Sequence, residues 1–388
     1  MPQEAKRLRR TAAAHVRART RAPFDWPFAI LALILTAFGL VMVFSASTAY
    51  CYYHFNGDSY RYIRQQAGFA AAGIVVMFVA SLFDYHLLHR FAWPLMAVTA
   101  VLLVVVLFMP EYNDAHRWIT IPHLGTFQPS EIAKFAVILL FAHIISVNSQ
   151  HMQTSLYGVA PFVCILLVLS GLMLAEPHLS GTLLILGIGV ILMFVGGTRL
   201  IWFIGALGGI GAAVGAVFLL FPSLVDRANS RLAYWKDPWI DPLGKGHQTI
   251  QSLYAISSGG LFGLGIGNSR QKHMYVPEPA NDFIFSILCE ELGFVGAMIV
   301  ILLFVALLAR GIYIASRARD KFGALLVVGI VSQIMLQAIL NIAVVTKTVP
   351  NTGIGLPFFS YGGTALLMLL GEVGIVLAVS RQSSIEKL

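Results

Sequence analysis

The chain has 388 residues, of which 58% are hydrophobic and only 11% are charged. A water-soluble globular protein carries about 25% charged residues, so this composition excludes that class and predicts a polytopic membrane protein. The net charge of +8 comes mainly from seven Lys and Arg residues within the first 21 positions. Because a basic segment beside a membrane span is typical of a topology signal, we expect no nucleic-acid partner.

Ten apolar runs are long enough to cross a bilayer as helices, which takes about 20 residues each. The expected fold class is therefore an all-α polytopic membrane protein, with a basic tail at 1–25, one ten-helix membrane domain at 26–381 and a short tail at 382–388. The runs lie near residues 26–46, 66–82, 91–109, 129–147, 158–175, 179–197, 200–221, 283–309, 322–345 and 361–380. The first run is too long for a secretory signal peptide and precedes other spans, so we expect an uncleaved anchor.

The distribution of basic residues predicts the orientation. The two tails and the loops that follow even-numbered spans hold fifteen Lys and Arg residues, against ten in the loops on the opposite side. Six of those ten lie in the large loop 222–281 between the seventh and eighth runs, and long loops count little in the positive-inside rule. Both termini are therefore expected to be cytoplasmic and the large loop extracytoplasmic. No internal repeat at a fixed period indicates an inverted-repeat transporter.

Three polar clusters on the predicted outer side each allow two interpretations. The segment HRWITIPHLGTFQPSEIAK contains Arg117, Trp118, Glu131 and Lys134, which fit either an interfacial tryptophan with a helix-surface ion pair or a cationic pocket for a phosphate. Glu176 in EPHLSGT belongs either to a simple turn between spans or to a site. The prolines and glycines of VPNTGIGLPFFSYGGTALL predict a broken or re-entrant segment, which is either structural or functional.

The fourth cluster lies between residues 244 and 293, where polar residues and glycines separate two apolar runs. Lys272, Glu278 and Asp282 fall within eleven positions. Asp282 is at the start of the eighth span, a position that suits a helix N-cap as well as a catalytic carboxylate. Glu290 and Glu291 follow about 12 to 14 Å further along the helix axis. Carboxylates at membrane depth are candidates for function, although a lysine of the fourth span could simply pair with one.

Long motifs in this region carry a family resemblance. The stretches are QSLYAISSGGLFGLGIGNSRQK, YVPEPANDFIFSILCEELGFVG and LPFFSYGGTALL, with RWI and FQPSEIAK upstream. They resemble the SEDS family of bacterial cell-wall polymerases, which includes FtsW, RodA and SpoVE, over essentially all ten spans. GLGIGNSRQK, YVPE and NIAVV look more like FtsW and SpoVE than RodA. Two positions depart from the family pattern: Ala280-Asn281 replaces a His-Thr pair before the loop aspartate, and His178 replaces an aspartate.

The resemblance implies a peptidoglycan glycosyltransferase that polymerises lipid II, a disaccharide-pentapeptide on undecaprenyl pyrophosphate, on the outer face of the membrane. Such a reaction needs a carboxylate to deprotonate the attacking sugar hydroxyl, and cations beside the leaving pyrophosphate. Asp282 is the expected general base. The expected substrate contacts are Arg117, Lys134 and Lys272 as cations, Glu131 and Glu278 as orienting groups, and Trp118, Gln251 and Ser252 as further contacts.

Further expectations follow from the same resemblance. The sequence establishes no cofactor, although a divalent cation, magnesium or manganese, could bridge pyrophosphate and carboxylate. The expected partners are a class B penicillin-binding protein, which is the cross-linking transpeptidase, other proteins of the division machinery, and membrane lipid. The expected location is the bacterial cytoplasmic membrane, at the division septum for an FtsW-type member. The alternatives are a RodA-type elongation polymerase, a structural scaffold, and a lipid II flippase, which needs polar residues through the whole bilayer depth.

Overall fold

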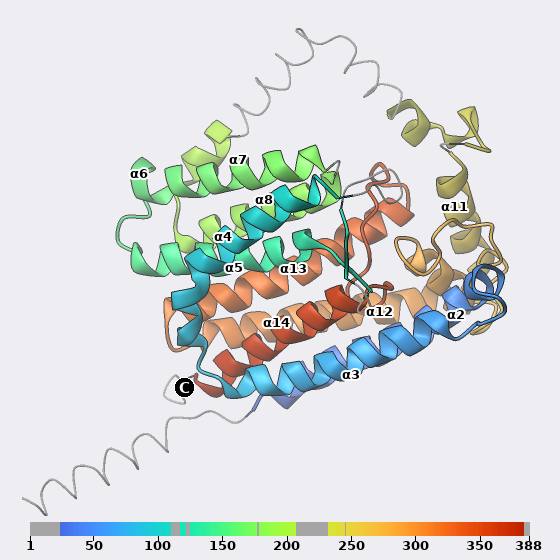
Figure 1. Cartoon of the computed structure of the whole chain (residues 1–388), viewed down its shortest axis with the longest axis horizontal. Helices are drawn as coiled ribbons and strands as arrows, with labels where there is room; N and C mark the ends of the chain where they lie inside the picture. Colours follow the sequence, from blue (N-terminus) through green and yellow to red (C-terminus); the bar gives the residue numbers. More distant parts are fainter. Residues whose placement is uncertain are drawn as a thin grey trace, which may run out of the picture.

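The computed structural model describes residues 24–109, 117–121, 125–176, 178–206, 232–244 and 246–383, and Figure 1 shows a bundle of long helices. Within these residues nine helical segments are long and apolar enough to cross a membrane. They are α2 (Trp26–His54), α3 (Arg61–Leu82), η1 with α4 (Tyr85–Leu87 and Leu88–Val106), α5 (Pro129–Val147), α6 with α7 (Ser155–Gly158 and Ala160–Ala175), α8 (Leu179–Gly196), α12 (Ile284–Ser316), α13 (Lys321–Val345) and α14 (Gly363–Arg381). The polytopic helical class is confirmed, while most of the predicted seventh span, 200–221, lies outside the described residues.

Helices α5 and α13 lie in the interior of the bundle. Helix α4 packs along α5, α3 packs along α14, and α13 contacts α5, α8 and α12. Three polar residues of these interior helices, Lys134, Gln333 and Asn341, are buried. A buried polar group is costly unless it is hydrogen-bonded, so these side chains indicate where the bundle contains a polar site.

A short β-hairpin departs from the all-α prediction. Strands β1 (Ile119–Ile121) and β2 (Gly125–Phe127) pair antiparallel, with Ile119 opposite Phe127. Since β2 leads directly into α5, the hairpin brings Arg117 and Trp118 back beside the start of that helix. The predicted loop 222–281 also contains regular structure: the short helix η2 (Pro238–Ile240) and α11 (His247–Gly259), which packs against α12.

Helix α12 is interrupted at Gly293, whose φ of 67° is in the left-handed region. A Cβ at Gly293 would lie 2.4 Å from the amide nitrogen of Gly263, and a Cβ at Gly263 would lie 2.2 Å from the carbonyl oxygen of Glu291. Only glycine permits such close crossing of two backbones. The crossing fastens the loop that follows α11 to the first turns of α12.

The predicted N-terminal tail ends inside the folded bundle. The Asp25 carboxylate accepts a hydrogen bond from the Phe28 amide at 3.1 Å and pairs with Arg310 of α12 at 2.9 Å. Asp25 therefore caps α2 and ties it to α12. Residues 1–23 of the predicted basic tail and 384–388 of the predicted C-terminal tail lie outside the described residues.

Candidate active site

A cavity of about 580 Å³ opens among α3, α5, α8, α13, α14 and the segments that connect them. Six of the nine predicted site residues line it: Arg117, Trp118, Glu131, Lys134, Glu278 and Asp282. These residues come from two of the predicted polar clusters, so the fold brings together groups that are distant in the sequence. Lys272, Gln251 and Ser252 are not among the lining residues.

Asp282 is half-buried. Neighbouring segments hydrogen-bond with the backbone at Asp282 and just before it. The Asn341 side-chain amide of α13 donates to the Asp282 carbonyl oxygen at 2.8 Å. The backbone amide of Tyr361 donates to the carbonyl oxygen of Ala280 at 2.8 Å. These bonds fix the segment just before α12 and leave the Asp282 carboxylate on the cavity wall.

The structure contradicts the interpretation of Asp282 as a helix cap. The N-cap residue of α12 is Phe283, and its side chain makes no capping hydrogen bond. No hydrogen bond between the Asp282 carboxylate and another described residue is present. A capping aspartate would accept from a backbone amide of the first turn, so the position requires another explanation.

The environment of Asp282 suits a general base. The pKa of its carboxyl is raised to about 6: burial is the main cause, the nearby charge of Glu278 acts in the same direction, and Arg117 opposes the shift. Burial also lowers the pKa of Arg117, and the neighbouring carboxyl groups of Asp282 and Glu176 oppose that change. A base with a pKa just below neutral is ionised at physiological pH yet basic enough to take a proton in a transition state.

Cationic groups line another wall of the cavity. The Lys134 ammonium contacts Glu131 Oε1 at 2.8 Å and Gln337 Oε1 at 3.0 Å. The predicted Glu131–Lys134 ion pair is therefore present, but it lies inside the bundle rather than on a helix surface, because Lys134 is only 3% exposed. The Arg117 guanidinium donates through Nε to the carbonyl oxygen of Glu176 at 3.3 Å. Both cations are held in place beside the cavity.

Two groups near these cations carry no charge at neutral pH. Burial lowers the pKa of His178 to about 3, with the positive charges of Arg117 and Lys134 adding to the effect. Burial raises the pKa of Glu176 to about 8, against the opposing charge of Arg117. An ionised aspartate at position 178 would add a negative charge beside the cations. The neutral imidazole of His178 adds none. This wall can therefore stabilise an anionic leaving group.

Several buried polar atoms on the cavity lining lack partners among the described residues. They are Ser130 Oγ, His178 Nδ1, Asn281 Oδ1 and Gln333 Oε1. Buried polar atoms are normally hydrogen-bonded, so these atoms indicate that a polar ligand or water fills the cavity.

Three amides of α13 were missed by the sequence reasoning. Gln337 contacts Lys134 and also donates to the Gly355 carbonyl at 3.0 Å, and Asn341 holds Asp282. Together with Gln333 they recur every four residues, which places them on one face of a helix. That spacing inside an otherwise apolar run was the signal that could have identified them.

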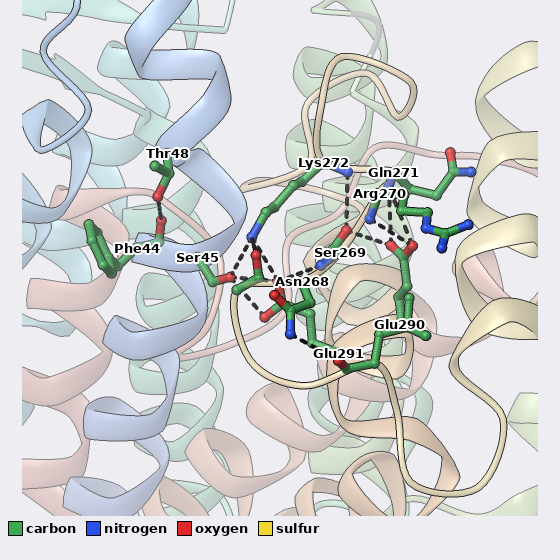
Figure 2. A network of polar contacts seen from close by, with 12 residues as sticks. Phe44, Ser45, Thr48, Asn268, Ser269, Arg270, Gln271, Lys272, Glu290 and Glu291 are labelled. Atoms are coloured by element: carbon green, nitrogen blue, oxygen red, sulfur yellow. Dashed lines mark hydrogen bonds and ion pairs between the residues drawn. The ribbon is translucent and has the colours of Figure 1, made fainter.

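The predicted role of Lys272 is not supported by its position. Its ammonium is buried and contacts Glu291 Oε1 at 3.0 Å and Ser45 Oγ at 3.1 Å, as Figure 2 shows. It also donates to the carbonyl oxygen of Gly267 at 2.7 Å. Neighbouring Glu290 accepts from the backbone amide of Arg270 at 2.9 Å. Both membrane-depth glutamates thus fasten the loop 260–276 to α2 and α12, and Lys272 is a structural ion-pair partner rather than a cavity residue.

Gln251 and Ser252 of α11 also lie away from the cavity. Ser252 is buried and its hydroxyl donates to the Val345 carbonyl at 3.0 Å, while Gln251 Nε2 lies 3.5 Å from His247 Nε2. The residue of α11 that lines the cavity is Gln248. Gln248 is three positions, or about one helical turn, before the predicted contact Gln251.

Within the described part of the chain, no three His, Cys, Asp or Glu side chains are grouped to hold a metal ion. Magnesium, however, is often held by one or two carboxylates together with substrate phosphates and water. Asp282 and its neighbour Glu278 fit that smaller donor set, because they interact electrostatically on one cavity wall.

Fold and site together define a polytopic membrane protein whose cavity combines a carboxyl group of raised pKa with a cationic wall. The chain belongs to the FtsW/RodA/SpoVE family of cell cycle proteins, whose model matches residues 25–385. The stage V sporulation protein E of Bacillus subtilis is 41% identical over 366 residues, covering 92% of this chain and 97% of that protein. A probable peptidoglycan glycosyltransferase FtsW of Trichlorobacter lovleyi is 38% identical, covering 92% and 93%.

Solved structures agree with this assignment. A chain from a peptidoglycan synthase complex that coordinates polymerisation and crosslinking superposes with a TM-score of 0.76, at 27% identity, over 93% of this chain and 98% of that chain. The rod shape determining protein RodA of Thermus thermophilus gives a TM-score of 0.68 at 25% identity, over 93% and 98%. The predicted family membership is therefore confirmed.

Proposed function

We propose that this protein is a peptidoglycan glycosyltransferase that polymerises lipid II into glycan strands. The observation that carries the proposal is one cavity in which Asp282, with a pKa of about 6, interacts electrostatically with Arg117. Relatives named as probable peptidoglycan glycosyltransferases, and the likeness to a peptidoglycan synthase complex, support the same reaction.

The chemistry assigned to the cavity is the transfer of a sugar from pyrophosphate to a hydroxyl. The Asp282 carboxylate takes the proton of the attacking sugar hydroxyl while the oxygen of that hydroxyl forms a bond to the anomeric carbon. The bond between that carbon and the pyrophosphate oxygen breaks, and the electron pair leaves with the pyrophosphate. Arg117 and Lys134 stabilise the charge that develops there. Glu278 orients the base and helps to raise its pKa, and the proton on Asp282 then passes to water.

A divalent cation is compatible with this arrangement. Asp282 and Glu278 supply the donors that magnesium or manganese prefers, and a bound cation would add positive charge beside the pyrophosphate. Such a cation would favour the ionised form of the Asp282 carboxyl over the protonated form. Measuring polymerisation with EDTA, and then with added magnesium or manganese, tests this part of the proposal, because an EDTA-resistant rate would remove the cation from it.

The remaining parts of the proposal concern setting and partners. The cavity faces outward and both termini are cytoplasmic, as the basic residues predict. A class B penicillin-binding protein is the expected partner, since the structural relative belongs to a complex that couples polymerisation with crosslinking. The relatives named SpoVE and FtsW support a role in division or sporulation, rather than RodA-type elongation, among other division proteins.

The direct test supplies lipid II to the purified protein, alone and with a class B penicillin-binding protein, and measures glycan length on gels. Replacing Arg117 with Gln should weaken the use of lipid II about tenfold to a hundredfold, because hydrogen bonds to charged groups contribute about 1.5 to 3 kcal/mol. If Arg117→Gln has wild-type kinetics, Arg117 is an interfacial anchor rather than a substrate contact. Absence of polymer in every wild-type preparation would contradict the proposed activity.

A further inference from the structure

The cavity has an aromatic wall that the proposed chemistry does not use. It consists of Tyr50 of α2, Tyr62 of α3 and Tyr361, which precedes α14. The rings of Tyr62 and Tyr361 are parallel, with centroids 3.9 Å apart, and the ring of Tyr50 lies 5.8 Å from that of Tyr62. The Tyr361 hydroxyl donates to Gln65 Oε1 at 2.6 Å, and Gln65 also lines the cavity. Aromatic faces and an amide therefore meet on one wall.

The aromatic wall continues toward the exposed end of the α2–α3 hairpin. His54 stacks on Tyr50 with centroids 4.1 Å apart, and Phe55 lies 5.9 Å from Tyr62. The Arg61 guanidinium covers the Phe55 ring at 4.3 Å. His54 and Arg61 are exposed, so a row of rings connects the interior of the cavity with the surface of the protein.

The aromatic wall has a defined position relative to the reacting groups. The backbone amide of Tyr361, whose ring stacks on Tyr62, donates to the carbonyl oxygen of Ala280 at 2.8 Å, two residues before Asp282. The charge of Asp282 in turn interacts with that of Arg117 on the cationic wall. The sequence of groups along the cavity is therefore cation, carboxylates, aromatic rings. If the pyrophosphate is bound at the cationic wall and the reacting hydroxyl at Asp282, sugars beyond the reacting one extend toward the rings.

We propose that the aromatic wall binds the amino-sugar strand next to the reaction centre and guides it out of the cavity. This inference rests on the proposed glycosyl transfer and adds to it a binding site for the saccharide. A pyranose ring has an apolar face of C–H groups, which packs on an aromatic ring, and hydroxyl and amide edges, which hydrogen-bond with polar side chains. Tyr50, Tyr62 and Tyr361 supply the rings, and Gln65 and Gln248 on the cavity lining supply the amides.

An aromatic belt at the membrane surface is the competing explanation, because tyrosines gather at membrane interfaces. Tyr60 fits that explanation: it is 59% exposed, it stacks on Phe44 with centroids 5.5 Å apart, and it is absent from the cavity lining. Tyr62 is two residues away but half-buried and inside the cavity. Tyr60 is therefore a matched control in the same hairpin.

The test measures binding separately from catalysis. The full-length protein in lipid nanodiscs is titrated with a peptidoglycan tetrasaccharide that carries neither lipid nor pyrophosphate, followed by saturation-transfer NMR. Binding to Tyr62→Leu and Tyr50→Leu should be about tenfold weaker than to wild type, equivalent to about 1.4 kcal/mol. Tyr62→Phe, which keeps the ring, and the control Tyr60→Leu should bind as wild type does. Tyr62→Leu and Tyr50→Leu should also make shorter glycan strands from lipid II, whereas Tyr62→Phe and Tyr60→Leu should not.

Asp282→Asn separates this inference from the proposed catalysis, because the variant should bind the tetrasaccharide normally whether or not it polymerises lipid II. Thermal melting of each variant identifies any loss of fold, and Tyr50→Leu serves if Tyr62→Leu unfolds. The inference is overturned if wild type does not bind the tetrasaccharide, if the Leu variants bind as tightly as wild type, or if Tyr60→Leu loses as much affinity as Tyr62→Leu.

Discussion

Replacing Asp282 with asparagine tests the central assignment of the site. Asparagine keeps the shape of the side chain but cannot accept a proton at neutral pH. If Asp282 is the general base, lipid II polymerisation should fall by at least about a hundredfold, the usual scale of general-base loss. The effect should come from chemistry alone, because the Asn341 amide holds the backbone carbonyl of residue 282, and the substitution leaves that carbonyl unchanged.

The structure also predicts how the substitution affects stability. Burial raises the pKa of Asp282 from the usual 3.8 to about 6. The folded protein therefore binds this proton more tightly than the unfolded chain does. The stabilisation is complete below the unfolded pKa and is lost as the pH rises through about 6. Above that pH the ionised carboxylate costs the folded state up to about 3 kcal/mol relative to a solvent-exposed one, a cost that asparagine removes.

Rates of glycan synthesis and melting temperatures, both measured at pH 7.5, distinguish a catalytic from a structural role of Asp282. Asp282→Asn and Asp282→Ala should both melt no lower than wild type, since the carboxylate caps no helix, and both should be inactive. Asp58→Asn provides the control, because Asp58 forms a surface ion pair with Arg64 outside the cavity. Near-normal polymerisation by Asp282→Asn would refute the base assignment. A lower melting temperature shared by both variants would show a structural role instead.

Three further predictions concern charge, packing and orientation. The rate of polymerisation should fall as the pH drops below about 6, and Glu278→Gln should shift this limb to lower pH, because the Glu278 charge raises the pKa of the base; an unshifted profile counts against that coupling. Lys272→Met should lower the free energy of unfolding by about 3 to 5 kcal/mol, because it leaves Glu291 buried and unpaired. The double variant Lys272→Met/Glu291→Gln should recover part of the loss. A single variant that is stable but has a raised KM for lipid II would support the predicted substrate contact of Lys272. With the exposed native cysteine removed, Ser258→Cys should react with an impermeant thiol reagent outside intact cells and Ser316→Cys should not; the reverse pattern would invert the proposed topology.

The spans could be predicted from the sequence because a bilayer imposes a length and a composition on each helix. The predicted run 129–147 coincides with α5, and the run 283–309 begins one residue before α12. The place of Lys272 could not be predicted in the same way. Its distance from Asp282 along the chain is short, but the contact between Gly263 and Gly293 turns the loop so that Lys272 meets Glu291. That crossing is a tertiary contact, which no local pattern shows.

Asp282 and the amides of α13 show what kinds of pattern identify a site. Asp282 was predicted through the family resemblance, because its position at the start of an apolar run suits a helix N-cap as well as a catalytic carboxylate. Gln333, Gln337 and Asn341 were missed because uncharged amides hardly change the apolar character of a 25-residue helix. Their four-residue spacing places them on one face of the helix. Testing the polar residues of a span for periodicity, as is done for apolar residues in soluble helices, would identify them.

The depth of the cavity favours the polymerase over a transporter. On α14 the cavity lining begins at Gly363 and ends at Glu372, about 13 Å along the helix at 1.5 Å per residue. The hydrocarbon core is about 30 Å thick, so the length of this lining along α14 is less than half of that thickness. Beyond Glu372 the buried residues of α14 are mainly apolar, including Val373, Val376 and Leu377. A path for a pyrophosphate headgroup needs polar lining through the rest of that thickness, whereas a glycosyltransferase needs only a pocket at one surface that keeps Asp282 near water and the lipid tail in the membrane.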